Sequence, residues 1–142
     1  MGYEIFTEEW VNAWEQELNR NEKYREAAQK WEGETVLVLK ADPEKGLEED
    51  RTVILDLWHG KCRVGKIAND NDLESAPYII SASPENWKQI LDGKLDPLMA
   101  LMRGKLQLTK GKLTDLLPYI TAAKEMISSA ASVDTEFPEG WE

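Results

Sequence analysis

The sequence predicts an α+β fold in which helices cover one face of a mainly antiparallel sheet. Helical periodicity fills about the first thirty residues, short strand-like segments follow to residue 82, and helical patterns with one late strand occupy the rest. Strands and helices that are segregated along a chain in this way are typical of α+β proteins. With 142 residues, 42% of them hydrophobic, the chain has the size of one domain, 1–142, with one core.

Two N-terminal segments have apolar residues at helical spacing. Thr7 is suited to cap the first helix because acidic residues follow it in the first turn, and the apolar stripe is Trp10, Trp14 and Leu18. The polar residues 19–21 offer a break. A second helix, or a bent continuation of the first, is then expected to run to a stop at Gly33, with the stripe Tyr24, Ala27, Ala28 and Trp31.

Four segments then have the composition of strands. Residues 35–40 are short and β-branched, and residues 51–58 alternate so that Val53, Leu55 and Leu57 share one face, which predicts a hairpin between the two. Residues 61–68 form a third candidate, supported by Val64 and Ile67. A polar loop is expected over 69–72, before a fourth strand at 78–82.

Caps and glycines define the remaining elements. Ser83-Pro84 starts a short helix whose inner side is Trp87, Ile90 and Leu91. Asp96 caps the next helix, Pro97 takes its first position and Gly104 ends it, before a strand at 105–109. A long helix is expected from about residue 113, where Pro118 either is tolerated near the first turn or moves the start of the helix to itself. The acidic tail from about residue 133 is expected to be extended or frayed.

The region from residue 93 to residue 109 is the most informative part of the chain. It contains Gly93-Lys94, Asp96-Pro97, Ala100 and Gly104-Lys105-Leu106, with mostly apolar residues between them. This arrangement resembles the sterol carrier protein domain family, whose members carry these elements at this spacing. The resemblance extends to Trp31-Glu32-Gly33, to the strand that ends at Gly60 and to the C-terminal helix, so it covers nearly the whole chain; Lys110 adds a residue before Gly111.

The resemblance implies a five-stranded sheet, an apolar cavity between sheet and helices, and lipid binding without catalysis. The wall that it implies comprises residues from two strands and three helices: Leu55, Leu57, Trp87, Leu91, Leu98, Leu101, Met102, Leu106, Leu108, Leu117, Ile120 and Met126. Aromatic and apolar side chains are the usual lining of such sites. Among the tryptophans, Trp10, Trp14 and Trp31 are interpreted as core packing, Trp87 as a cavity residue and Trp141 as part of the tail.

The net charge of −10 argues against nucleic acid as a partner and against stable docking on anionic membranes, and we expect no stable membrane insertion. The charge is uneven, however. Residues 88–112 hold six basic and two acidic residues, a net charge of +4, so the remainder carries −14. These lysines are either ordinary solvated side chains or a basic rim, formed by Lys105 and Lys112, that steers an anionic lipid head group.

Catalytic and metal sites are poorly supported. Asp56, His59 and Cys62 could form a thiolate nucleophile, but all three lie on one strand and its turn. Asp70, Asp72 and Glu74 imitate the start of a calcium loop, yet Ser75 and Ser81 stand where glycine and a bidentate acid are required. We therefore expect no catalytic residue, no cofactor and no metal.

The leading hypothesis is a cytoplasmic, non-catalytic protein that binds, and transfers, a fatty acid, acyl chain, sterol or similar lipid. A single cysteine suits a reducing compartment. The alternative is an interaction module with a closed core, which binds a partner enzyme or itself, so a homodimer is one expected arrangement. Periodicity does not decide between them, because it does not reveal whether the core contains a gap.

Overall fold

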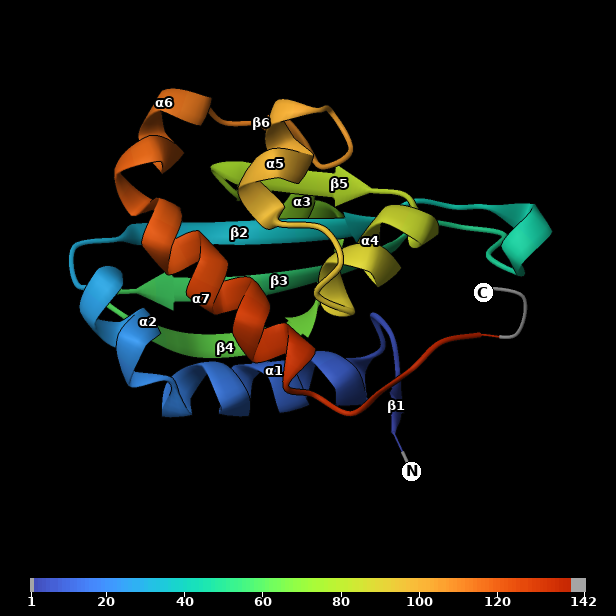
Figure 1. Cartoon of the computed structure of the whole chain (residues 1–142), viewed down its shortest axis with the longest axis horizontal. Helices are drawn as coiled ribbons and strands as arrows, with labels where there is room; N and C mark the ends of the chain where they lie inside the picture. Colours follow the sequence, from blue (N-terminus) through green and yellow to red (C-terminus); the bar gives the residue numbers. More distant parts are fainter. Residues whose placement is uncertain (1, 139–142) are drawn as a thin grey trace.

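A computed structural model describes residues 2–138, and its centre is a five-stranded sheet in the order β4-β3-β2-β5-β6 (Figure 1). The strands are β2 (Glu32–Leu39), β3 (Arg51–Trp58), β4 (Lys61–Ile67), β5 (Tyr78–Ala82) and β6 (Gln107–Lys110). Neighbouring strands are antiparallel except β2 and β5, which are parallel. The predicted α+β class and the mainly antiparallel sheet are confirmed.

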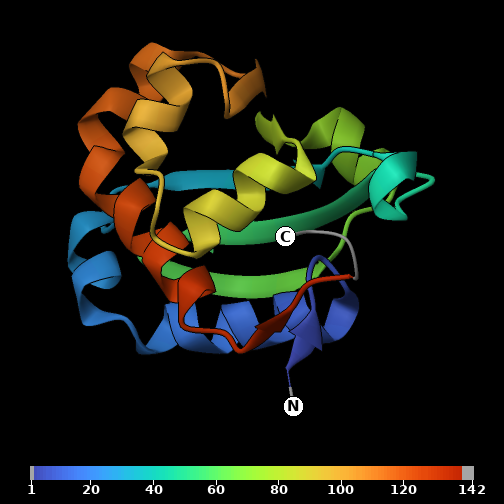
Figure 2. The same cartoon turned by 45° about the vertical axis from the view of Figure 1, so that its right-hand side comes forward.

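The main helices cover one face of this sheet. They are α1 (Glu8–Arg20), α2 (Glu22–Ala27), α4 (Pro84–Leu91), α5 (Pro97–Met102), α6 (Leu113–Leu116) and α7 (Ile120–Ala131). In Figure 1, α7 crosses diagonally in front of the sheet, while α1 runs along its β4 edge. Figure 2 shows the same helices gathered on one side. The main core therefore lies between these helices and the inward side chains of the strands.

The opposite face is covered in part by α3 (Asp70–Ser75). Val36 and Val38 of β2 pack there with Ile54, Leu73 and Ala76 in a small second cluster. The alternate residues of β2 face the main core. Because β2 is buried on both faces, its sequence is a continuous apolar run without polar alternation.

Large aromatic side chains fill the main core. Trp10, Trp14 and Trp87 are fully buried, and each indole N–H donates a hydrogen bond: to the hydroxyl of Thr135 (2.8 Å), to the carbonyl of Met126 (2.9 Å) and to the carbonyl of Val38 (2.9 Å). A buried indole without a partner would carry a desolvation cost. These bonds fix α1 and α4 against α7, the sheet and the C-terminal segment.

The edge of β4 is closed by side chains of α1. The Asn19 amide donates to the carbonyl of Cys62 (2.9 Å) and accepts from its N–H (2.8 Å), and Glu15 accepts from the N–H of Gly65 (2.6 Å). Gly65 permits this approach, since a Cβ there would lie 3.1 Å from the carbonyl oxygen of Val11. The two residues that supported the prediction of this strand, Val64 and Ile67, are in fact exposed.

A two-residue turn joins β3 to β4. Trp58 pairs with Lys61, while His59 and Gly60 have φ angles of 50° and 86°. Two consecutive positive φ angles define the type I′ turn that matches the twist of a hairpin. His59 also stacks on Trp58, with ring centroids 4.8 Å apart.

Three local predictions were wrong or incomplete. The second helix ends at Ala27, well before Gly33, because residues from Glu32 onward pair with β3 instead. The expected loop at 69–72 begins α3, where Asn69 and Asp72 form a capping box. The C-terminal helix is divided by Pro118 into α6, a short 3₁₀ helix η2 (Leu117–Tyr119) and α7.

The C-terminal segment is extended, as expected, but it is docked and not frayed. Its strand β7 (Thr135–Glu136) pairs in parallel with β1 (Tyr3–Glu4) near the N-terminus. Val133 is buried in the main core. Glu139, Trp141 and Glu142, the outer part of the predicted acidic tail, lie outside the described residues.

Candidate functional site: an apolar pocket between sheet and helices

An apolar pocket lies between the inner face of the sheet and the helices that cross it. Its floor consists of Thr35 and Leu37 from β2, Leu57 from β3 and Ile80 from β5. Tyr24 and Trp31 close one end, and Trp87 of α4 adds a further wall. Strand alternation positions the floor residues, because every second side chain of each strand faces the helices.

The outer wall comes from short helices and from α7. Pro97, Leu98 and Leu101 of α5 line the pocket, together with Leu106 from the segment between α5 and β6. Leu116 and Tyr119 contribute from the segment around Pro118. The α7 residues that line the pocket are Ile120, Ala122, Ala123, Lys124, Met126 and Ile127.

The pocket is small in this conformation. Its volume is about 70 Å³, whereas sites for drug-sized ligands usually measure about 300–1,000 Å³. An acyl chain or a sterol therefore needs the outer wall to move. The elements best able to move are α5 and the α6–η2 segment, because they are short and their side chains are only partly buried.

The polar groups of the pocket are few. Burial, and next the nearby Cys62, raises the pKa of Tyr24 far above its usual range, so this hydroxyl is neutral at physiological pH. Trp31 packs against Tyr78 and Tyr119, with both centroid separations at 4.9 Å. This end of the pocket is therefore an uncharged aromatic corner.

Lys124 is the exception. Among the described residues that line the pocket, it alone carries a charge. Its ammonium lies 3.6 Å from a carboxylate oxygen of Asp96, whose other oxygen accepts the N–H of Met99 and caps α5 (3.1 Å). The helix α5 is thereby tied to α7 at the exposed side of the pocket.

The structure brings together part of the wall that the sequence predicted. Leu57, Trp87, Leu98, Leu101, Leu106, Ile120 and Met126 line the pocket. Leu55 and Leu91 are buried in the core beside it, Leu108 is half-buried on β6, and Met102 and Leu117 are exposed. Lys105 and Lys112 are also exposed and do not line the pocket.

Three of the predicted wall residues that do not line the pocket have local explanations. Leu55 lies beside Gly65 under α1, away from the pocket. Met102 is in the last turn of α5, whose buried side is centred on Ala100. Leu117 begins the 3₁₀ helix, because Pro118 interrupts the continuous α-helix in which Leu117 and Ile120 would share a face.

Sequence reasoning missed several lining residues. Trp31 was interpreted only as core, yet it both packs in the core and lines the pocket. Lys124 could have been found, since Ile120, Lys124 and Ile127 have the i, i+4, i+7 spacing of one helical face. Thr35 and Ile80 could not, because the register between β2 and β5 is not visible in local periodicity.

The candidate nucleophile is not assembled. Cys62 is buried, its thiol donates to the carbonyl of Val64 (3.4 Å), and burial, with smaller contributions from Glu15 and Asp56, raises its pKa to about 12. The His59 ring contacts Glu32 instead (2.6 Å). A protonated, buried thiol is a poor nucleophile.

The acidic residues that imitate the start of a calcium loop do not form a metal site. Asp72 is part of the α3 capping box and lies 3.4 Å from the Lys66 ammonium. Across residues 2–138, the structure contains no group of three or more His, Cys, Asp or Glu side chains that could hold a metal ion. None of the helices in this part of the chain is long and apolar enough to cross a membrane.

The model of one protein family, the SCP-2 sterol transfer family, matches residues 11–113, which include the whole sheet and α5. The chain belongs to this family. No curated protein matches the sequence significantly. The SCP-2 match ends at Leu113, so α7 and Lys124 lie beyond it.

Solved structures agree with the SCP-2 assignment. A crystal structure of sterol carrier protein 2 has 42% sequence identity and a TM-score of 0.84, over 92% of this chain and 99% of that one. A protein from Thermus thermophilus, described as possibly a sterol carrier protein, has 40% identity and a TM-score of 0.83, over 99% and 96% of the two chains. Sterol carrier protein 2 from Yarrowia lipolytica, at 20% identity and a TM-score of 0.56, over 86% and 89%, shares the fold.

Proposed function

We propose that this protein binds a hydrophobic molecule, such as a fatty acid, an acyl chain or a sterol, in the apolar pocket and carries it without covalent chemistry. The observation that supports this most directly is the composition of the pocket: a gap in the core bounded almost entirely by apolar and aromatic side chains. A core that served packing alone would be filled to close to crystal density. The family of the chain points in the same direction.

The energetics favour binding even though the pocket must expand. Burying about 15 methylene groups at ~0.8 kcal/mol each gives ~12 kcal/mol before the costs of ordering and opening. An exposed ion pair contributes only ~0.2–1 kcal/mol. Affinity would therefore come from the apolar wall, while charge would decide which end of the ligand faces water.

The proposed orientation places a polar head group at Lys124. Its ammonium stands at the exposed side of the pocket beside Asp96, whereas Tyr24 and Trp31 form an uncharged corner. An apolar tail would then point toward Trp31 and the sheet. Lys105 and Lys112, exposed on the segments before and after β6, would act at longer range by attracting anionic ligands toward the mouth.

The proposed wall follows the pocket. It includes Leu57, Trp87, Leu98, Leu101, Leu106, Ile120 and Met126, joined by Trp31 and Ile80. Leu55, Leu91 and Leu108 would contact a ligand only after expansion. Met102 and Leu117 would frame the mouth from outside. A reducing compartment such as the cytoplasm fits the free Cys62.

The small volume favours one alternative. A closed core that binds a partner protein, or a second copy, through exposed apolar side chains would not need a larger pocket. Native mass spectrometry of freshly purified protein, with lipid analysis of the released material, separates the two. A stoichiometric lipid that added fatty acid displaces supports the carrier; a mass without ligand that takes up neither acyl chain nor sterol at micromolar concentration contradicts it.

A matched pair of variants sharpens this experiment. Ala123→Phe fills the pocket from α7, whereas Ala131→Phe adds the same ring at an exposed position of the same helix. We expect Ala123→Phe to weaken binding of a fluorescent fatty acid at least tenfold and Ala131→Phe to leave it unchanged. Equal affinities in both variants would place the ligand elsewhere.

A further inference from the structure

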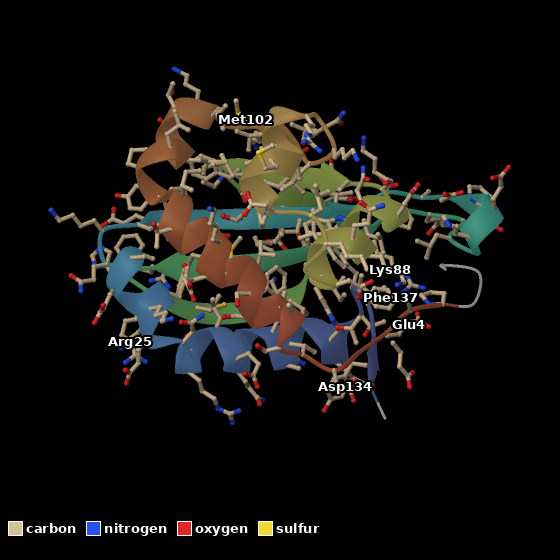
Figure 3. All side chains as sticks on the ribbon, viewed as in Figure 1. Glu4, Arg25, Lys88, Met102, Asp134 and Phe137 are labelled. Carbon is tan, nitrogen blue, oxygen red and sulfur yellow. The ribbon has the colours of Figure 1, made fainter. Side chains whose placement is uncertain are left out.

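Exposed apolar side chains gather on the short helices that form the outer wall of the pocket, and we take this side as its mouth. Met99, Met102, Leu113 and Leu117 are among the exposed large hydrophobic residues, and Met102 reaches 68% exposure. They belong to α5, α6 and η2, whose inner residues line the pocket. Figures 1 and 2 show α5 and α6 next to each other at one end of the molecule, and Figure 3 shows Met102 there. We call this surface, with the cations Arg103, Lys105 and Lys112 on the segments just after α5 and just before α6, the mouth face.

The charge of this region is opposite to that of the whole chain. Residues 94–119 contain five basic and two acidic residues, a net charge of +3, so the remainder carries −13. Both acids are engaged: Asp96 with Lys124, and Asp115 with the Tyr78 hydroxyl, which donates to it at 3.3 Å.

The cations of the mouth face are free to meet a partner. Arg103, Lys105 and Lys112 are exposed, and none of them forms an ion pair with any residue between 2 and 138. Cations without an ion-pair partner lie here beside exposed methionine and leucine side chains. This combination matches the interface of an anionic bilayer, where phosphates lie directly above acyl chains. A second copy fits poorly, because it would bring the same positive charges together.

We propose that the mouth face docks reversibly on an anionic lipid surface. The methionine and leucine side chains would enter the head-group region, and the three cations would contact lipid phosphates. The rest of the molecule, at −13, would be repelled by the same surface, so only this orientation is favoured. The mouth of the pocket would then face the bilayer. The idea that docking serves ligand exchange depends on the function proposed above. The docking itself does not depend on that function.

Vesicle flotation tests the proposal with the full chain. Vesicles of phosphatidylcholine alone are compared with vesicles that contain about 30% phosphatidylglycerol, roughly the composition of a strongly anionic membrane. We expect binding to the anionic vesicles only, weakened by added salt because exposed charges are screened. A double variant, Lys105→Gln with Lys112→Gln, should lower the partition coefficient about 25-fold, because each cation contributes about a fivefold change. Met102→Gln with Leu117→Gln should lower it at least tenfold.

Two control variants carry matched changes elsewhere. Lys23→Gln with Lys30→Gln removes two exposed cations of the N-terminal region, and Val64→Gln with Ile67→Gln removes two exposed apolar side chains of β4. Circular dichroism confirms that each variant is folded. We expect both controls to bind vesicles at least as well as the original protein.

Several outcomes would overturn the proposal: no binding of the original protein to anionic vesicles at low salt, equal losses in control and mouth-face variants, or a protein complex through this face in place of vesicle binding. Fatty acid binding without vesicles is measured in parallel. Vesicle binding without ligand binding would contradict only the carrier function, and ligand binding without vesicle binding would contradict only the docking.

Discussion

The ammonium of Lys124 on α7 lies 3.6 Å from the carboxylate of Asp96, the residue that caps α5. This ion pair connects the most movable wall of the pocket to the helix that crosses the sheet. Both side chains are nearly half exposed, so the pair restrains α5 only weakly. A weak restraint is what a wall that must open and close requires.

Replacing Asp96 by Asn should loosen this wall without removing the helix cap, because an amide oxygen also accepts the N–H of Met99. We expect fatty acid association and dissociation to accelerate by up to about fivefold, the equivalent of ~1 kcal/mol. Stopped-flow fluorescence measures both rates. Asp92→Asn, which breaks the Lys88–Asp92 pair of α4 without touching α5, is the control and should leave the rates unchanged.

Lys124→Met should distinguish ligands by their head groups. Removing the ammonium while keeping the aliphatic stem should weaken a long-chain fatty acid about tenfold and leave the corresponding fatty alcohol within about twofold, since hydrogen bonds to charged groups contribute about 1.5–3 kcal/mol. Isothermal titration calorimetry gives both affinities. The same substitution at Lys112 serves as comparison; a selective loss there and none at Lys124 would assign the head group to the rim predicted from the sequence.

Gly60→Ala should be among the most destabilising single-methyl additions in this chain. Gly60 has a φ of 86°, and a Cβ would lie 2.6 Å from the backbone oxygen of Arg25 in α2. We expect a loss of about 3 kcal/mol from backbone strain and the shift of α2. Gly93→Ala is the control, because Gly93 also has a positive φ, 77°, but nothing within 4 Å. It should cost about 1 kcal/mol in urea unfolding; equal losses would show that the contact with α2 is unimportant.

The buried thiol of Cys62 makes stability depend on alkaline pH. Folding raises its pKa from 9.0 to about 12 because the thiolate would be desolvated. The contribution of this group to the free energy of unfolding is therefore complete below about pH 9 and is lost as the pH rises toward 12, while the unfolded chain ionises.

We expect this contribution to fall by about 1.4 kcal/mol between about pH 8 and pH 10. The measurement is the difference in urea unfolding free energy between the original protein and Cys62→Ala at each pH. Subtracting the variant removes the effect of other groups that titrate in this range. A difference that stayed constant over this whole interval would mean that the folded protein ionises this thiol as readily as the unfolded chain.

The elements that local chemistry determines were predicted well. The strands β3 and β5 and the helix α4 have the expected bounds, because alternation, the Ser83 cap and Pro84 act within a few residues. Elements that depend on distant partners were not. The chain leaves helical structure after Ala27 to pair residues 32 and beyond with β3, a preference that no local pattern reveals.

The pocket was predictable in its location but not in its details. The family resemblance indicated that sheet and helices enclose it, and side chains such as Trp87 and Leu101 are where that implies. Its volume depends on how closely α5 and α7 approach the sheet, which is a property of packing and not of periodicity. The exclusion of Leu117 follows from one proline whose effect the sequence left open.

The bonds from Asn19 and Glu15 to the backbone of β4 also limit how copies of this protein can associate. A five-stranded sheet has two outer strands, and here the side chains of α1 already occupy backbone groups of one of them. Growth into a fibre needs two open edges on every molecule, since each copy must join one neighbour on either side. With β4 blocked, strand addition to this sheet is confined to β6, so it would end with a single pair of molecules.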